Sequence, residues 1–109
     1  MANWKLTVNI SKEIKDLKKF TENLNEDCEL IDETGDKFVE LAQKLEARIK
    51  SYEADIKRIT EDDGTFEDLE NELEDFVMSC DIESANYTMN SIYEICDTAG
   101  IWLEQLLTV

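Results

Sequence analysis

The chain has 109 residues, of which 42% are hydrophobic, and its formal net charge at pH 7 is −16. This length and apolar content predict one folded domain over residues 1–109 and exclude a disordered acidic tail. Histidine is absent from the sequence, which excludes serine–histidine and cysteine–histidine nucleophiles, histidine-ligated metals and imidazole acid–base catalysis. Any enzyme with this sequence would have to work through carboxylates.

No stretch of the sequence approaches the roughly 20 consecutive apolar residues of a membrane span, and the N-terminus lacks the basic-then-apolar pattern of a signal peptide. We therefore expect a soluble, cytoplasmic protein with no membrane partner. The three cysteines, Cys28, Cys80 and Cys96, are odd in number and show no C-x-x-C spacing. They argue against a disulfide framework or a zinc site, and we predict that all three are small core residues.

The charges are distributed unevenly along the chain. All eleven basic residues lie at or before Arg58, whereas the segment from Ile59 to Val109 contains fourteen acidic residues and no Lys or Arg. A surface of one sign repels itself and slightly destabilises the compact state. Attraction to a strongly basic surface is a physical reason for such a surface to exist.

The first predicted element is a short strand, because apolar and polar residues alternate at the start of the chain. The apolar ones are Trp4, Leu6, Val8 and Ile10. A lone strand in a helical protein must pair with an irregular segment or with another subunit, and otherwise the segment is not a strand. A first helix is then predicted to begin with Ser11 as its N-cap. Its apolar side consists of Ile14, Leu17, Leu24, Cys28 and Ile31, and its exposed basic patch, which we interpret as a solvated face, of Lys12, Lys15, Lys18 and Lys19.

A second helix is predicted after a turn at Gly35. Its apolar residues recur at spacings of four and three, which form a continuous heptad seam. They are Phe38, Ala42, Leu45, Ile49, Tyr52, Ile56 and Ile59. The spacing fits a seam inside an antiparallel bundle and also fits a coiled coil between two copies of the chain, so a homodimer remains open.

A third helix is predicted after the turn Glu61-Asp62-Asp63-Gly64, with Thr65 and Asp68 in the positions of a capping box. At about 100° per residue, its apolar residues fall within one arc of the helix. They are Phe66, Leu69, Leu73, Phe76, Val77 and Cys80. The outward arc consists of carboxylates, from Glu67, Asp68, Glu70, Glu72, Glu74 and Asp75.

The last predicted helix carries a further seam through Ala85, Met89, Ile92, Cys96, Ala99, Leu103 and Leu106. Gly100 either ends this helix or lies within it. The residues beyond Gly100 would be apolar around most of a helix, so we expect the bundle, a second subunit or a partner to enclose them. The sequence therefore predicts an all-α bundle of about four helices with a short N-terminal β-strand.

The acidic face of the third helix is the main candidate site. Six carboxylates spread over about 12 Å of helix give roughly one charge per 2 Å, close to the one per about 1.7 Å of duplex DNA. This face is predicted to compete for a cleft lined with Lys and Arg that normally holds nucleic acid, although it also fits a face that only keeps the protein soluble. The predicted partner-binding residues are Glu61, Asp62, Asp63, Glu67, Asp68, Glu70, Glu72, Glu74 and Asp75.

In size, charge and helical content, the chain resembles the small, acidic, helical inhibitors that bacteriophages and mobile elements encode against nucleic-acid-binding host enzymes. These include DNA mimics and anti-CRISPR proteins. The resemblance implies that the carboxylates take the place of phosphates on the basic surface of a partner protein. We therefore predict a non-enzymatic interaction protein, an inhibitor, with no catalytic residue, no metal, no cofactor and no direct binding of nucleic acid.

A second resemblance points to an enzyme. Glu67-x-x-Glu70 and Glu94-x-x-Asp97 are similar to the paired E-x-x-E and E-x-x-D motifs of the MazG-like all-α nucleotide pyrophosphohydrolases. In that family, four carboxylates face each other and hold magnesium against a nucleoside triphosphate. The chain departs from the pattern because no Lys or Arg follows Arg58 to bind the phosphates. This activity and a homo-oligomeric structural bundle remain alternatives.

Overall fold

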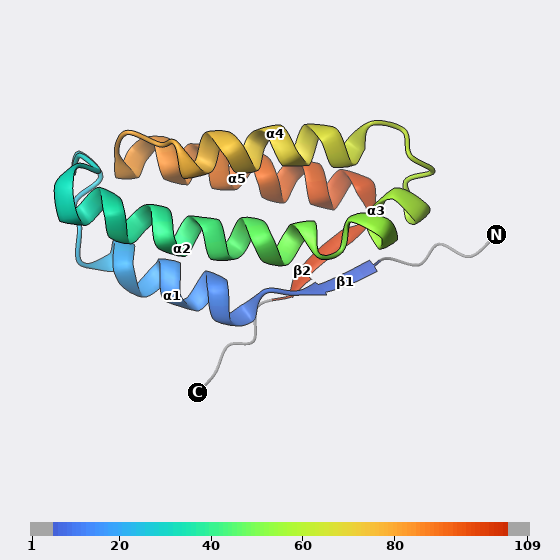
Figure 1. Cartoon of the computed structure of the whole chain (residues 1–109), viewed down its shortest axis with the longest axis horizontal. Coiled ribbons are helices and arrows are strands. Elements are labelled where there is room, and N and C mark those ends of the chain that lie inside the picture. The colour runs from blue at the N-terminus through green and yellow to red at the C-terminus, as the bar shows by residue number, and fades with distance from the viewer. Residues whose placement is uncertain (1–5, 105–109) are drawn as a thin grey trace.

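The computed structural model describes residues 6–104, and it confirms a mainly helical bundle with a short strand near its start (Figure 1). The elements in chain order are β1 (Leu6–Asn9), α1 (Ser11–Glu22), α2 (Asp32–Lys50), α3 (Glu53–Ile59), α4 (Thr65–Val77), α5 (Ile82–Ala99) and β2 (Ile101–Glu104). Four of the helices are long. The short α3 and the strand β2 are the elements that the sequence did not separate from their neighbours.

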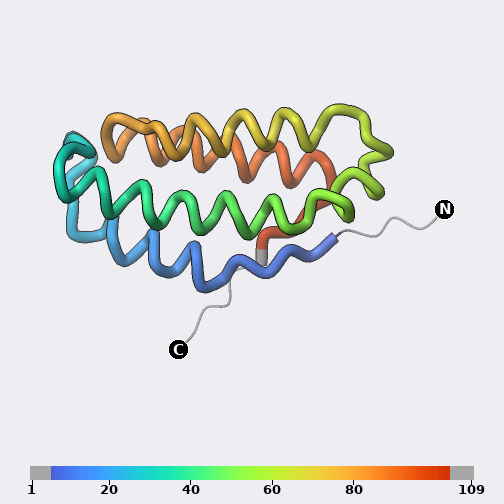
Figure 2. Tube along the Cα trace, viewed as in Figure 1, coloured from blue at the N-terminus to red at the C-terminus, as the bar shows by residue number. Residues whose placement is uncertain are grey.

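The four long helices pack side by side in the order α1, α2, α4, α5. In both views of the backbone, α1 lies along one long edge of the molecule and α4 along the opposite edge (Figures 1 and 2). Their facing sides bury a continuous apolar core. Within this core the rings of Phe38, near the start of α2, and Phe76, near the end of α4, meet edge to face, with centroids 5.2 Å apart. Burial of these side chains supplies most of the stability of helices of this length.

The predicted N-terminal strand is present, and its ladder partner is the end of the same chain. β1 pairs in parallel with β2, with Leu6 beside Ile101 and Asn9 beside Glu104. The expected alternation holds, since Val8 is buried and Thr7 is exposed. Pairing with another subunit is therefore not needed to explain this strand. Trp4 lies outside the described residues.

Of the two alternatives for Gly100, the end of the helix is confirmed, whereas the helical seam predicted to continue through Leu103 is wrong. Gly100 has φ 82° and ends α5 in the left-handed conformation, which glycine adopts without steric cost. The following Ile101, Trp102 and Leu103 are residues that favour strands, and they form β2. Leu106, predicted as part of the helical seam, lies outside the described residues.

The N-caps of α1 and α4 are Ile10 and Gly64, one residue before the predicted Ser11 and Thr65, and neither makes a side-chain capping hydrogen bond. Ser11 is the first residue of α1. Its backbone N–H and its hydroxyl donate hydrogen bonds to the side-chain oxygen of Asn9, at 3.2 and 3.0 Å. At α4 the carboxylate of Asp63 accepts from the N–H and hydroxyl of Thr65, at 3.0 and 2.6 Å. The predicted capping box of Thr65 with Asp68 is therefore wrong, because Thr65 already lies inside the helix.

The first helix is shorter than predicted, and the turn at Gly35 is wrong. α1 ends at Glu22, so Leu24, Cys28 and Ile31 belong to the connection rather than to its apolar side. Gly35 lies inside α2, where the backbone of Leu30 passes close to it. A Cβ atom at this position would lie 2.7 Å from the carbonyl oxygen of Leu30, which is too close. This contact explains why the position is glycine, although glycine is unfavourable inside a helix.

The heptad seam of the second predicted helix is core, but it is divided between two helices. A turn at Ser51 and Tyr52 separates α2 from α3. In the single chain, the side chains of Phe38, Leu45 and Ile56 are each at most 1% exposed to solvent. The seam is therefore not available to form a coiled coil with a second copy.

The cysteines differ in burial, contrary to the prediction that all three are core residues. Cys96 is buried, and burial raises the pKa of its thiol to about 12. Cys28 is partly buried and Cys80 is exposed, because both lie in connections rather than on helix faces. All three are free thiols. Within residues 6–104, no helix combines the length and the apolar character needed to cross a membrane.

Asp81 caps the start of α5, and its removal tests the pH dependence of stability. Its carboxylate accepts a hydrogen bond from the backbone N–H of Ser84 at 2.7 Å, which lowers the pKa of Asp81 below its usual 3.8. The cap therefore stabilises the fold above that value, and its contribution is lost as the pH falls through the lowered pKa. We expect Asp81→Ala to reduce the urea midpoint at neutral pH and to flatten its fall below about pH 4. Asp81→Asn is the control, because it keeps an acceptor oxygen but does not titrate in this range.

Candidate acidic groove between two helices

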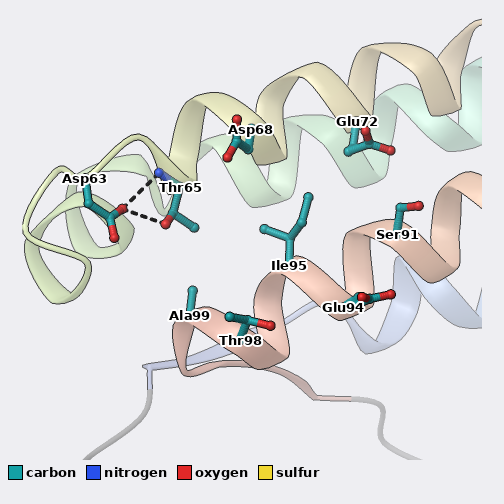
Figure 3. Close-up of a pocket in the computed structure, with 9 residues that line it drawn as sticks. All are labelled: Asp63, Thr65, Asp68, Glu72, Ser91, Glu94, Ile95, Thr98 and Ala99. Atoms are coloured by element: carbon teal, nitrogen blue, oxygen red, sulfur yellow. Dashed lines mark hydrogen bonds between the residues drawn. The ribbon is translucent and has the colours of Figure 1, made fainter.

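The surface between α4 and α5 carries a groove whose walls are acidic (Figure 3). Its volume is about 490 Å³, and it is lined by Asp63, Thr65, Asp68, Glu72, Ser91, Glu94, Ile95, Thr98 and Ala99. In the close-up, Asp68 and Glu72 extend from α4 above Ser91 and Glu94 of α5. Four carboxylates line the groove, and no Lys or Arg is among the described residues that line it.

The helix divides the six predicted carboxylates of α4 into two stripes. At about 100° per residue, the members of each stripe fall within about 60° of one another. The groove stripe consists of Asp68, Glu72 and Asp75. The lysine-side stripe consists of Glu67, Glu70 and Glu74.

The lysine-side stripe lies toward basic residues of α2 and α3. The Nζ atom of Lys50 lies 3.6 Å from Oε2 of Glu70. The pKa of Lys57 is raised mainly by a hydrogen bond and attraction from Glu53, with further contributions from Asp62 and Glu67. The protein's own cations thus partly neutralise this side of α4.

The groove stripe has no such compensation in the part of the chain that the structure describes. No ion pair between residues 6–104 involves Asp68, Glu72 or Glu94. Asp63, at the mouth of the groove, accepts two hydrogen bonds from Thr65, which lower the pKa of its carboxyl. The groove therefore carries uncompensated negative charge at neutral pH.

The turn before α4 contributes the other predicted site residues. Glu61 and Asp62 are exposed and adopt the left-handed backbone conformation, with φ of 56° and 52°. Their tight turn brings Asp63 to the end of the groove, whereas neither Glu61 nor Asp62 lines it. The predicted set is thus spread over the groove, the turn and the lysine-side stripe.

Sequence reasoning missed the second wall of the groove. Ser91, Glu94 and Thr98 recur at spacings of three and four on α5 and therefore share one side of that helix. Tyr87, two turns before Glu94, lies on the same side and is 75% exposed. This polar stripe could be found in the sequence opposite the apolar seam, but only the packing of α5 on α4 shows which carboxylates it faces.

The four carboxylates of the MazG-like resemblance do not converge. Glu70 pairs with Lys50, Glu94 lines the groove, and Asp97 lines a different hollow beside β2. Within residues 6–104, no group of three or more acidic or cysteine side chains is placed to hold a metal ion. The arrangement offers separated anionic oxygens, which suit cationic side chains better than a single divalent ion.

Comparison of the chain with protein-family profiles, with curated proteins and with solved structures finds no match in any of the three.

Proposed function

We propose that the chain is a non-enzymatic inhibitor that binds a basic surface of a partner protein through the α4–α5 groove. The observation that carries this proposal is the groove itself, where carboxylates from two helices meet and no Lys or Arg between residues 6 and 104 contributes to the lining. A cationic partner bound in the groove would reduce the repulsion among these carboxylates more than water and salt ions do. Long-range attraction would also accelerate encounter with the partner.

The exposed Tyr87 supplies a contact of a different kind near this groove. Aromatic residues often carry much of the energy of an interface, and the face of a tyrosine ring attracts Arg and Lys. Because Tyr87 is 75% exposed on the side of α5 that bears Glu94, it can contact a partner already held by the carboxylates. Electrostatic attraction and aromatic contact would then act on the same basic segment.

A nucleic-acid-binding protein is the class of partner that we propose. Residues four apart in the groove stripe are separated by about 6 Å along the helix, which is a lower charge density than that of duplex DNA. The likeness to DNA therefore requires the carboxylates of both stripes of α4. The second wall adds Glu94 to this side. The surface therefore presents anions in two rows, as a duplex does, although the rows differ in exposure to the protein's own lysines. The free thiols are in keeping with action in the cytoplasm.

Salt-dependent capture tests this function. The immobilised chain is incubated with a bacterial lysate at about 50 mM salt, and bound proteins are eluted at about 500 mM, where exposed charges more than a few ångströms apart are screened. We expect the eluted proteins to bind nucleic acid and to be displaced by duplex DNA added in competition. Capture that survives high salt, or that DNA does not reduce, would contradict an electrostatic interface of this kind.

A further inference from the structure

A second hollow lies between α1 and α5, on the side of the bundle where these two helices hardly touch. α1 packs on α2, α2 on α4 and α4 on α5, whereas α1 and α5 make few contacts with each other within residues 6–104. The hollow has a volume of about 160 Å³ and shares no described lining residue with the acidic groove. It is therefore a separate site, which the proposed function does not use.

The floor and the walls of this hollow are apolar. It reaches down to Phe38 and Phe76, the edge-to-face ring pair of the core, which are 1% and 3% exposed. An apolar cavity of about 150 Å³ is large enough for a ligand the size of benzene. Aromatic rings and a methionine thioether both make favourable contacts with a further ring, so this lining suits an aromatic occupant. The walls come from the two flanking helices and consist of Ile14, Leu17, Ala85 and Met89.

The rim of the hollow is polar, and no Asp or Glu is among the described residues that line it. Lys18 lines it from α1 and Asn86 from α5, and both side chains are exposed. No ion pair between residues 6 and 104 involves Lys18. The hydroxyl of Thr21, in contrast, donates to the backbone carbonyls of Leu17 and Lys18, at 3.1 and 3.2 Å. The ammonium of Lys18 and the amide of Asn86 are both donors, which a carboxylate at the rim can accept.

We propose that this hollow binds a small aromatic carboxylate, with its ring on Phe38 and Phe76 and its carboxylate at the rim beside Lys18. Apolar walls with a few polar groups at one end are typical of small-molecule sites, where the polar groups fix the orientation of the ligand. The small volume limits the buried part of the ligand to about one ring. The unpaired ammonium of Lys18 favours an anion over a neutral or cationic molecule of the same shape.

The net charge of the chain does not prevent an anion from binding here. The chain carries −16 in total, but exposed charges more than about 8 Å apart are largely screened at physiological ionic strength. The acidic side chains nearest to bound ligand would be those in the lining, and the described lining contains none. The local charge at the rim is therefore set by Lys18.

Methyl NMR of the chain labelled at methionine tests the site. Met89 lines the hollow, whereas Met78 is 74% exposed at the end of α4 and provides an internal control. Titration with phenylacetate at about 150 mM salt should shift the Met89 signal saturably and leave the Met78 signal in place. A Met89 signal that phenylacetate does not move would overturn the proposal.

Two molecules with the same ring test the choice of a carboxylate. Benzyl alcohol is neutral and benzylamine is a cation, and both should bind at least about fivefold more weakly than phenylacetate, because neither can pair with Lys18. Benzyl alcohol that binds as tightly as phenylacetate would overturn the proposal. That result would instead indicate a site for a neutral apolar group, such as a side chain of a partner protein.

A pair of charge variants tests the role of Lys18. Lys18→Gln should weaken the binding of phenylacetate about fivefold and leave that of benzyl alcohol unchanged. Lys12→Gln is the matched control, because it makes the same change in net charge at an exposed position of α1 outside the lining. Equal losses in the two variants would contradict a contact between the ligand and Lys18.

A variant that fills the hollow tests its location. Ala85 is 2% exposed in the wall of the hollow, so the larger side chain of Ala85→Leu should occupy the space of the ring and abolish the shift of Met89. Circular dichroism should show unchanged helicity, and binding of an oligo-arginine peptide to the acidic groove should also stay unchanged. A folded Ala85→Leu variant that binds phenylacetate as tightly as the parent chain would overturn this location.

Discussion

Reversal of the groove charges by the triple change Asp68→Lys, Glu72→Lys and Glu94→Lys is expected to weaken binding of an oligo-arginine peptide about a hundredfold. Three exposed ion pairs would be lost and replaced by repulsion, and exposed pairs contribute up to about 1 kcal/mol each. Isothermal titration calorimetry at about 50 mM salt measures the effect. Circular dichroism should show unchanged helicity, because all three side chains face the groove and not the core.

The matched control reverses the lysine-side stripe, with Glu67→Lys, Glu70→Lys and Glu74→Lys. This variant has the same net charge as the groove variant. Because Lys50 and Lys57 already partly neutralise this stripe, we expect a smaller loss of peptide binding. Equal losses in the two variants would show that net charge, and not the groove, determines binding.

Truncation of Phe38 to alanine is expected to have the largest effect on stability. The ring is 1% exposed and packs edge to face against Phe76, so its removal leaves a cavity in the core. Changes of this kind cost about 3–5 kcal/mol, a large part of the 5–15 kcal/mol by which domains are typically stable. Urea unfolding followed by circular dichroism measures the loss.

Tyr87→Ala serves as the comparison for that measurement. The side chain is 75% exposed, so its truncation should change the free energy of unfolding by no more than about 0.5 kcal/mol. The same variant should weaken peptide binding if the ring contacts the basic partner. A loss of less than about 1 kcal/mol for Phe38→Ala would contradict the burial of that ring in the core.

Hydrophobic periodicity predicted the helical faces of this protein well. The spacing of Phe38, Leu45 and Ile56 indicated core positions, and each of them is buried. Alternation around Val8 likewise indicated β1. These patterns succeed because burial on one face is imposed by the geometry of a helix or strand, whatever the element packs against.

The elements that the sequence did not predict depend on contacts between distant segments. The apolar run after Gly100 fits a buried helix or a buried strand, and only the presence of β1 beside it decides for a strand. The helix starts also differ from the prediction: the N-caps are Ile10 and Gly64, and the side chains of Asn9 and Asp63 accept hydrogen bonds from the first helical residues. The exact residue at which a helix begins depends on the local backbone conformation, which residue type alone does not determine.

The candidate site was predicted in part. Nine carboxylates were assigned to one binding surface, but the sequence could not show that Lys50 approaches Glu70 from another helix. Nor could it show that Glu94 faces Asp68 and Glu72 across a groove. Both facts follow from the way α4 packs against its neighbours, which periodicity along a single helix does not determine.

The pairing of β1 with β2 also bears on the order of folding. The two strands are the first and last described elements, so their ladder closes a loop of nearly the whole chain. Closing such a loop is entropically unfavourable until the intervening helices have packed, which makes the ladder a late event. Its amide protons are therefore expected to exchange with solvent faster than those of the central turns of α2, through openings that leave the helices folded.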